Sequence, residues 1–432
     1  MKKITAALVG AGSRGNEYST YSLEHPDELQ MVAVVEPVKE QRELYAKKYG
    51  IAPENCFSDY PEFFARGKIA DCAFICTQDR MHFEPTMMAI DCGYDIMLEK
   101  PMSPSLEECI TMANHAAEKG VLLSLCYVLR FTEIFQKIKQ LLDDGEIGRL
   151  IAIQHNENVG FWHMAHSFVR GHWRNSDETS PMILAKSCHD MDLLYYLVGS
   201  KPVSVASFGS LNYFNKESAP NGSTDRCTDD CKYRDNCPYD ATKLYLGKNT
   251  GWPVDVVSLD PSLDARRKAL ETGPYGRCVH RCDNNVVDNQ VSIINFENGV
   301  NVAFTMSGFT KGISRTIKLM GSHGQIEAKL EDTTININLY KFQNAGFIKP
   351  DQDKYPFCVN IPVNVGEDIH GHGGGDLRLV ADFINNVRSK STNMLSSARN
   401  SVYSHIMAFA AEKSRLENRV VNISEYNFDV ED

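Results

Sequence analysis

The first 145 residues alternate between short apolar runs and longer stretches of helical character. The apolar runs, each of strand length, cover residues 4–10, 31–36, 70–77, 94–100 and 121–128. The stretches between them predict helices at about residues 38–50, 82–93, 105–119 and 131–145. Ser105 with Glu108 forms a capping box at one helix start, and Gly50 ends another helix. Strands that alternate with helices over short connections predict an α/β fold with a parallel, doubly wound sheet.

The pattern changes at about residue 149, where strands begin to dominate. Residues 289–309 predict a hairpin that turns at a Glu-Asn-Gly sequence, and residues 315–330 predict a second hairpin. Further strands are predicted at residues 149–160, 202–214 and 334–342, and late helices that return to the first domain at residues 376–421. We therefore expect two domains, residues 1–148 and an α+β domain of residues 149–432 with an open, mostly antiparallel sheet.

Residues 183–197 carry polar side chains between apolar runs. If this stretch is one helix, Lys186, His189 and Asp190 stand at positions i, i+3 and i+4 on one face. That face could be a solvated surface on which Lys186 pairs with Asp190, or it could line an active site. The pattern alone leaves both interpretations open.

Composition and charge argue against several classes of partner. Hydrophobic residues make up 43% of the 432-residue chain, which is enough for substantial cores. The chain has 45 basic and 56 acidic residues and a net charge of −11, which argues against nucleic acid or an anionic membrane surface as a partner. No apolar run approaches the roughly 18 residues of a membrane span. The short apolar run after Lys2 and Lys3 leads directly into a glycine motif, so we expect a strand and a cytoplasmic protein.

A glycine motif follows the first predicted strand. Gly10, Gly12 and Gly15 form G-x-G-x-x-G, with Ser13 and Arg14 between the last two glycines. In a dinucleotide-binding site the first glycine permits a tight turn, the second lets the backbone approach a pyrophosphate, and the third lets helix and strand pack closely. The next helix N-terminus then offers free N–H groups to the phosphates. The motif in this context predicts a Rossmann domain.

The second predicted strand ends at an acidic residue, Glu36. A carboxylate here accepts hydrogen bonds from both hydroxyls of an adenosine ribose and repels a 2′-phosphate, so NAD is favoured over NADP. Lys39 and Arg42 follow closely and weaken this preference.

Polar residues also follow two later strands, at the edge where ligands bind in such sheets. Thr77 ends one apolar run, and Glu99 with Lys100 ends another before Pro101. These residues could form the nicotinamide end of the cofactor site, or they could be ordinary solvated strand ends.

Taken together, the chain resembles the Gfo/Idh/MocA oxidoreductases, the superfamily of glucose–fructose oxidoreductase and inositol dehydrogenase. The resemblance is carried, in chain order, by Gly10, Gly12 and Gly15, Thr77 and His82, Glu99-Lys100-Pro101, Tyr127 and Arg130, residues 145–148, Trp173-Arg174, His189 and Asp192. It implies a nicotinamide cofactor, a sugar-like or cyclitol-like substrate, and Lys100 and His189 as catalytic residues. It also implies a homo-oligomer, a dimer or tetramer, formed through one face of the second sheet.

One position departs from the family pattern. The family has an Asp four residues before its His, but here that position is Ala185 and Lys186 follows. Burial and a neighbouring cation both lower the pKa of a lysine, so Lys186 or Lys100 could act as a base near neutral pH. We therefore add Lys186 to the catalytic candidates.

A loop rich in His and Trp precedes this stretch. Aromatic rings cover the C–H faces of sugars, and imidazole nitrogens bond hydroxyl groups, although such a loop can equally be surface. The substrate-binding candidates are Arg130, His163, His166, Trp173, Arg174 and Asp190. A glycine-rich segment, residues 370–376, carries His370 and His372, which could also reach the pocket.

Five of the thirteen cysteines fall in a polar insert at about residues 215–285. They are Cys227, Cys231, Cys237, Cys278 and Cys282. The insert is too long for a plain loop and is expected to be too polar for a core of its own, so it needs a staple. Four thiolates around a structural zinc ion, or an iron–sulfur cluster, would provide one. Free thiols are the alternative, and disulfides fit poorly with a cytoplasmic protein.

The functional hypothesis is an NAD(P)-dependent oxidoreductase that transfers a hydride between nicotinamide and a hydroxyl-bearing carbon of a sugar, sugar derivative or cyclitol. Two alternatives stay open. One is a glycosidase of the same fold that uses NAD for a transient oxidation at C3. The other is a non-catalytic sensor that binds a dinucleotide.

Overall fold

The computed structural model describes residues 2–330, 336–342, 358–363 and 372–426. Its first sheet has six parallel strands, β1 (Ile4–Val9), β2 (Leu29–Val35), β3 (Cys56–Phe57), β4 (Cys72–Ile75), β5 (Asp95–Leu98) and β6 (Leu123–Leu125). The spatial order is β3-β2-β1-β4-β5-β6, so the chain runs outward from β1 in both directions. This order is that of a doubly wound Rossmann sheet, and the predicted fold class is confirmed.

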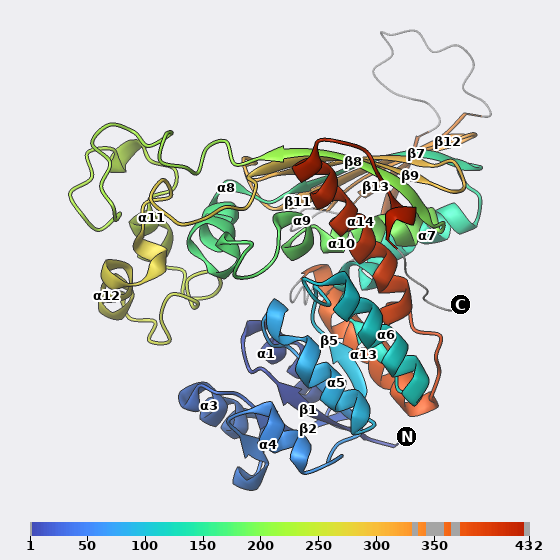
Figure 1. Cartoon of the computed structure of the whole chain (residues 1–432), viewed down its shortest axis with the longest axis horizontal. Coiled ribbons are helices and arrows are strands. Elements are labelled where there is room, and N and C mark those ends of the chain that lie inside the picture. Colours follow the sequence, from blue (N-terminus) through green and yellow to red (C-terminus); the bar gives the residue numbers. More distant parts are fainter. Residues whose placement is uncertain (1, 331–335, 343–357, 364–371, 427–432) are drawn as a thin grey trace.

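Helices cover both faces of the first sheet (Figure 1). They are α1 (Ser13–Ser19), α2 (Tyr21–Glu24), α3 (Lys39–Tyr49), α4 (Tyr60–Ala65), α5 (Phe83–Asp91) and α6 (Leu106–Lys119). Helix α7 (Glu133–Asp143) follows the last strand of this sheet and lies beside the second sheet instead (Figure 1). Ser105 accepts a hydrogen bond from the Glu108 amide, but the Glu108 carboxylate accepts one from Ser103, so only half of the predicted capping box forms. Gly50 ends α3 with φ of +67°, as predicted. The pattern missed β3 and α4, because elements this short show no periodicity.

The second sheet is mostly antiparallel, as predicted. Its nine strands are β7 (Leu150–Asn158), β8 (Pro202–Ser210), β9 (Asn289–Phe296), β10 (Asn301–Ser307), β11 (Ser314–Gly321), β12 (Gly324–Leu330), β13 (Asn336–Lys341), β14 (Cys358–Pro362) and β15 (Val421–Asn422). The order is β14-β13-β12-β11-β7-β10-β9-β8-β15, and only β7 with β10 is a parallel pair among them. Both predicted hairpins form, the first around Gly299 with φ of +84°. Residues 334 and 335 of the predicted last strand lie outside the described residues.

Three helices lie against one face of the second sheet, between it and the first domain (Figure 1). They are α9 (Met182–Ala185), α10 (Cys188–Val198) and α14 (Ala398–Glu417). Helix α13 (Gly375–Ser389) returns to the first sheet, where Leu379 and Phe383 share a core with Leu8 and Phe74. The late helices thus connect both domains, since α14 contacts β8 as well as α6.

The stretch at residues 183–197 is two helices rather than the single helix that its apolar pattern suggests. Helix α9 ends at Ala185 and α10 begins at Cys188, and Ser187 between them has φ of −86° and ψ of 4°. Lys186 therefore leaves the first helix instead of sharing a face with His189. The break allows the Lys186 side chain to reach strand β7, a tertiary contact that periodicity does not reveal.

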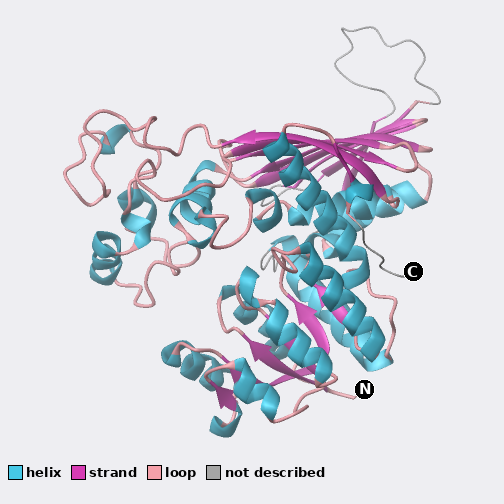
Figure 2. Cartoon of the chain, in the orientation of Figure 1, coloured by secondary structure: helices cyan, strands magenta, loops and turns pink. Residues whose placement is uncertain are grey.

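The cysteine-rich insert lies between β8 and β9 and consists mostly of loop (Figure 2). Its short helices α11 (Ala241–Tyr245) and α12 (Leu263–Thr272) bury a separate apolar cluster of Ala241, Tyr245, Val254 and Leu270. The expectation that the insert is too polar for its own core is therefore wrong. The apolar residues are spaced too widely along the chain to show as a pattern.

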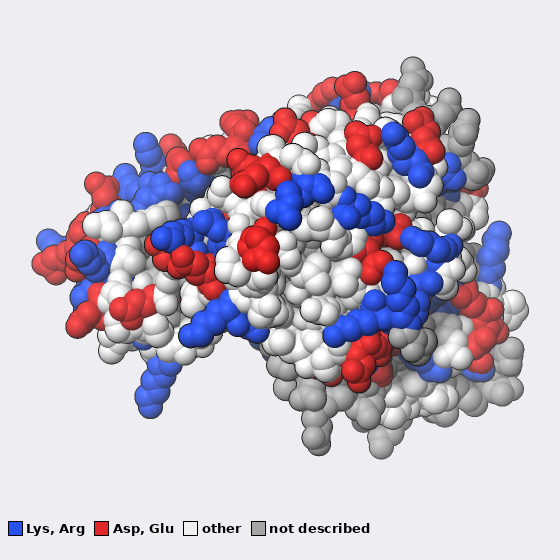
Figure 3. All heavy atoms as spheres, turned by 90° about the horizontal axis from the view of Figure 1, so that it is seen from below, with Lys and Arg blue, Asp and Glu red and all other residues white. Residues whose placement is uncertain are grey.

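The described surface carries mixed charge. On the face drawn in Figure 3, basic and acidic side chains are interleaved around an uncharged centre. None of the described helices has the length and apolar composition that a bilayer span requires.

A buried ion pair joins the two domains. Arg130 lies in a 3₁₀ turn after β6 and donates Nε and Nη2 to the carboxylate of Asp192 on α10, both at 2.6 Å. Its Nη1 donates to the carbonyl of Leu395 at 2.7 Å. Both side chains are almost fully buried, so neither charge has solvent as an alternative partner.

Arg130→Met should destabilise the protein by about 3–5 kcal/mol, because it leaves the Asp192 carboxylate buried and unpaired. Denaturant unfolding measures the effect. Lys139→Met, which removes an exposed i,i+4 pair with Asp143 on α7, is the control and should cost no more than about 0.5 kcal/mol. Equal losses of unfolding free energy in the two variants would show that the buried ion pair stabilises the protein no more than the exposed one.

Candidate active site

The glycine motif forms a tight turn between β1 and α1. Gly10 has φ of +97°, and a Cβ atom there would lie 2.6 Å from the Cys76 carbonyl oxygen. A Cβ on Gly15 would lie 2.3 Å from the Gly10 carbonyl oxygen, so neither position accepts a side chain. A Cβ on Gly12 would meet nothing within 4 Å, and Ser13 follows it as the first residue of α1. The turn therefore leaves open the one position where a pyrophosphate must approach the backbone, and it fits a dinucleotide.

Glu36 lies beside this turn, at the end of β2. Its carboxylate accepts hydrogen bonds from the backbone amides of Ala11 at 2.9 Å and Val38 at 3.0 Å. The two nearby cations are engaged elsewhere, since Arg42 donates to the Glu36 backbone carbonyl and Lys39 pairs with Glu43. An acidic side chain at the end of β2 favours NAD over NADP, because it repels a 2′-phosphate.

Arg14 ties the glycine turn to two other segments. Its Nε donates to Glu99 at 3.1 Å, its Nη2 donates to Asp376 on α13, and Tyr18 donates to the same Glu99 oxygen at 2.6 Å. Burial opposes ionisation of Asp376, but the charges of Arg14 and His372 hold its pKa well below the usual range. Tyr18 and Asp376 were missed in the sequence, because no motif or spacing connects them to the glycine turn.

Lys100 extends from the end of β5 towards the second domain. Its Nζ donates to the Ala185 carbonyl oxygen at 3.3 Å and lies 6.0 Å from the centre of the Trp173 ring. His82 holds this edge together, with its ring nitrogens 3.0 Å from the Thr77 carbonyl and 2.8 Å from the Pro101 carbonyl. The predicted nicotinamide-end residues therefore do lie together at the carboxyl ends of β4 and β5.

His189 lies near Lys100 and is almost fully buried. Its Nδ1 has no hydrogen-bond partner among the described residues, and its ring centre is 5.6 Å from that of His372. Burial, followed by the charges of Lys100 and His372, lowers the pKa of His189 well below its usual value. The imidazole is therefore neutral near pH 7 and can accept a hydrogen bond. His370 lies outside the described residues.

Lys186 enters a buried network of charges. Its Nζ lies 3.3 Å from Glu157 on β7, and only 13% of its side chain is exposed. Arg315 on β11 lies 2.5 Å from the other Glu157 oxygen and donates to Asp190 at 2.8 Å, and His155 Nε2 is 2.7 Å from Asp190. The interpretation of Lys186 as an exposed residue paired with Asp190 is therefore wrong.

Burial lowers the pKa of Lys186, Glu157 raises it, and Arg315 lowers it again; the net direction is downward. Burial works against ionisation of Asp190, yet the Arg315 charge keeps its pKa well below the usual range. Glu157 and Arg315 were missed in the sequence, because both lie in strands that look ordinary on their own.

Two of the predicted substrate-binding residues, Arg130 and Asp190, have side chains committed to buried ion pairs. Arg174 donates to Asp283 through two nitrogens at 2.9 Å. Trp173 stays partly exposed beside Lys100 and donates its indole N–H to Asp79 at 3.2 Å.

The other two predicted substrate-binding residues, His163 and His166, lie on the segment that leads from β7 towards the insert. Both are buried. His163 lies 5.1 Å from the Trp252 ring, and His166 Nδ1 lies 2.8 Å from the Tyr245 hydroxyl. His163 and His166 are therefore not surface residues, and both contact the insert.

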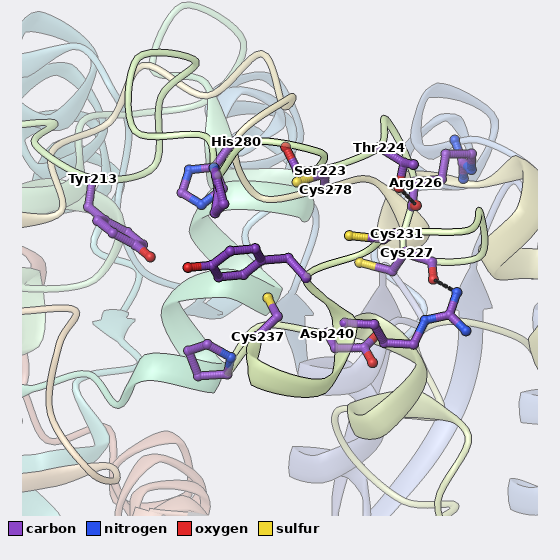
Figure 4. Close-up of a pocket in the computed structure, with 14 residues that line it drawn as sticks. Tyr213, Ser223, Thr224, Arg226, Cys227, Cys231, Cys237, Asp240, Cys278 and His280 are labelled. Atoms are coloured by element: carbon purple, nitrogen blue, oxygen red, sulfur yellow. Dashed lines mark hydrogen bonds between the residues drawn. The ribbon is translucent and has the colours of Figure 1, made fainter.

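The insert cysteines lie close to one another, and three of them, Cys227, Cys278 and Cys282, are near Arg170. Cys227, Cys231, Cys237 and Cys278 line a cavity of about 50 Å³ (Figure 4), and Cys282 donates to the Cys278 carbonyl at 3.3 Å. Within the described ranges, no three His, Cys, Asp or Glu side chains are arranged to hold a metal ion, so the structure gives no support to the zinc prediction.

Arg170 lies beside the insert cysteines. It is buried, donates Nε to the Arg277 carbonyl at 2.7 Å and Nη2 to the Tyr239 carbonyl at 2.6 Å, and lies 3.5 Å from the Cys227 sulfur. All thirteen cysteines are free, and burial raises the pKa of the Cys282 thiol to about 11.

The chain matches known proteins over both domains. Residues 4–127 match the oxidoreductase family with an NAD-binding Rossmann fold, and residues 139–423 match the C-terminal alpha/beta domain of the same family. The chain therefore belongs to the Gfo/Idh/MocA oxidoreductase family.

Among its relatives, the protein YteT of Bacillus subtilis (strain 168) is 23% identical over 367 residues, 82% of each chain. The scyllo-inositol 2-dehydrogenase (NAD(+)) of the same organism is 25% identical over 48% of this chain and 58% of its own length. The D-glucoside 3-dehydrogenase of Escherichia coli (strain K12) is 28% identical over 34% of this chain and 41% of its own. A levoglucosan dehydrogenase structure, in complex with NADH and L-sorbose, shares the fold with a TM-score of 0.72 at 16% identity, covering 98% of this chain and 99% of that one.

Glu36→Ala should weaken NAD binding by about tenfold or more and reduce the preference over NADP, because it removes charge-assisted hydrogen bonds to the ribose. Calorimetric titration with each dinucleotide measures both effects. Glu43→Ala, on the exposed face of α3, is the matched acidic control and should change neither affinity. If wild-type protein binds NADP more tightly than NAD, the role given to Glu36 is wrong.

Proposed function

We propose that this protein is an NAD-dependent dehydrogenase that oxidises a hydroxyl group of a sugar, sugar derivative or cyclitol. The observation that carries the proposal is the convergence of Lys100, Lys186 and His189 beside Trp173, at the nicotinamide end of a turn that fits a dinucleotide. The inositol and glucoside dehydrogenases among the relatives support this class of substrate.

Charge balance favours Lys186 as the base. Beneath the pocket, Arg315 faces the carboxylates of Glu157 and Asp190, and Lys186 faces Glu157. Lys100 adds a further positive charge, and none of the described carboxylates lies within ion-pair distance of it. A buried region with one excess cation is stabilised if one lysine gives up its proton. Only 13% of the Lys186 side chain is exposed, and burial lowers its pKa.

Each residue then has a distinct task. Neutral Lys186 accepts the hydroxyl proton of the substrate, and neutral His189 accepts a hydrogen bond that orients this hydroxyl. Lys100 donates a hydrogen bond that stabilises the alkoxide as it develops. When bound, NAD supplies the hydride acceptor. Trp173 covers one face of the site and excludes water from it.

Lys186→Met should lower kcat/KM by about 10² or more while the fold survives, because it keeps the apolar stem but removes the base. In the wild-type protein, kcat/KM should rise with pH up to the lowered pKa of Lys186, since only the unprotonated amine accepts a proton. That rise should vanish in the variant. NADH absorbance in a screen of sugars and cyclitols measures both.

Lys39→Met, an exposed lysine on α3, is the control and should behave like the wild-type protein. If Lys186→Met keeps the wild-type pH profile of kcat/KM, Lys186 is not the base and its role is structural. Turnover without accumulation of NADH would favour the glycosidase alternative, and no turnover on any sugar would favour the sensor.

We also propose that a second copy of the chain covers the open face of the second sheet. The helices lie on the opposite face (Figure 1), and Phe208, Val291 and Ile293 are exposed on the open one. Phe208 is 68% exposed and pairs across strands with Val291, so the apolar surface is continuous over β8 and β9. Such a patch on a sheet is typical of an association surface.

Phe208→Lys should convert the assembly to a monomer, because it places a charge in the centre of the apolar patch. Light scattering after size exclusion measures the mass. Leu416→Lys, at an equally exposed apolar position on α14, is the control and should leave the mass unchanged. A wild-type protein that is already monomeric would contradict the proposal.

A further inference from the structure

His372 lies beside the candidate site, on a segment that the proposed reaction does not yet use. It comes just before α13, and its ring centre is 5.6 Å from that of His189. The side chain of His372 is 33% exposed, whereas that of Lys186 is 13% exposed and His189 is 4% exposed. His372 therefore lies between the buried bases of the site and the solvent.

Asp376, in the first turn of α13, orients the His372 ring. His372 Nδ1 lies 3.2 Å and 3.3 Å from the two carboxylate oxygens, and Arg14 of the glycine turn donates to one of them. Burial works to raise the pKa of Asp376, but the charges of Arg14 and then His372 hold it well below the usual range. A carboxylate only accepts hydrogen bonds, so Nδ1 carries the hydrogen and Nε2 keeps its lone pair.

The backbone at His372 has an unfavourable conformation. Its φ is +28°, and Gly373 and Gly374 follow with φ of +64° and +79°. A non-glycine residue with positive φ costs on the order of 1–3 kcal/mol and persists only where other contacts hold it. The turn brings the His372 ring back to Asp376, and this contact holds the residue in place.

The His372 imidazole is available as a proton acceptor. Desolvation by the surrounding protein lowers its pKa, the Asp376 carboxylate raises it, and the charges of Arg14 and Lys186 lower it again; the net direction is downward. The ring is therefore neutral near pH 7. None of the described hydrogen bonds uses its Nε2. An imidazole with a paired Nδ1 and an available Nε2 is typical of a residue that accepts and releases protons.

The proposed reaction leaves a proton deep in the protein. The C–H bond of the substrate breaks and its electron pair moves with the hydrogen to the cofactor. The O–H bond breaks, its proton moves to Lys186, and a C=O bond forms. Lys186 must lose this proton before it can act again, but its Nζ lies against Glu157 and has little access to water.

We propose that His372 takes up this proton at Nε2 and releases it to bulk water in every catalytic cycle, with Asp376 as the residue that positions its ring. The distance between the His189 and His372 rings allows a hydrogen bond or one bridging water. The proton moves from Lys186 by way of His189 to His372, where the Asp376 carboxylate stabilises the imidazolium until it is deprotonated. This inference rests on the proposed function for the reaction that releases the proton.

His372→Asn tests the proposal, because the shorter amide can still donate to Asp376 but cannot carry a proton. Stopped-flow absorbance follows NADH from the first turnover onward, with a sugar or cyclitol that the wild-type protein oxidises. The variant should form about one NADH per active site at the wild-type rate and then continue about 10²-fold more slowly, because Lys186 stays protonated. Imidazole added to the buffer should restore the later rate by carrying the proton instead.

His115→Asn is the matched control. His115 on α6 also pairs an imidazole with a carboxylate, since its Nε2 lies 2.8 Å from Asp91 on α5. This pair lies near the C-terminal ends of both helices, at the edge of the first sheet opposite to Lys100. The substitution should leave the first and later turnovers unchanged, and added imidazole should have no effect on either rate.

Wild-type steady-state turnover in His372→Asn would overturn the inference. It is also overturned if the first turnover slows as much as the later ones, because His372 would then act in hydride transfer or in the fold rather than in proton release. A wild-type protein that forms no NADH from any compound of the screen would contradict the proposed function itself, and the inference with it.

Discussion

The burial of Lys186 against Glu157 is the contact on which the candidate site depends. Lys186 makes this contact from the break between α9 and α10, and His189 lies at the start of α10. Arg315 on β11 pairs with Glu157 on β7 and with Asp190 on α10, so one network of charges connects both strands to this helix. A charge at this depth is costly unless it is paired or neutralised. Here the pairing is incomplete, because Lys186 shares the Glu157 carboxylate with Arg315.

The sequence was sufficient for the features that are local. The glycine turn, the parallel sheet and the two hairpins all follow from spacing and turn chemistry, and Lys100 and His189 follow from the family pattern. The contacts that decide the chemistry are long-range. Glu157 and Arg315 come from strands, and Asp376 reaches Arg14 from a helix 362 residues away along the chain. No single-sequence pattern connects such positions, and the break at Lys186 was hidden for the same reason.

The insert is held by contacts that its cysteine spacing did not reveal. Its cysteines do cluster, and four of them line one cavity. The staple is nevertheless built from a small apolar core and from Arg170 and Arg266, whose guanidinium groups collect backbone carbonyls. Each of these arginines fixes part of the insert relative to the candidate site.

The central claim is that hydride moves from a carbohydrate carbon to NAD at the site of Lys100, Lys186 and His189. Its most direct test uses sugars and cyclitols carrying deuterium on their ring carbons, incubated with the protein and NAD, with mass spectrometry of the cofactor. Deuterium should accumulate in NADH with wild-type protein, and this accumulation should be lost in the Lys186→Met variant. A cofactor pool that stays oxidised and free of deuterium, while the protein consumes any of these compounds, would contradict it.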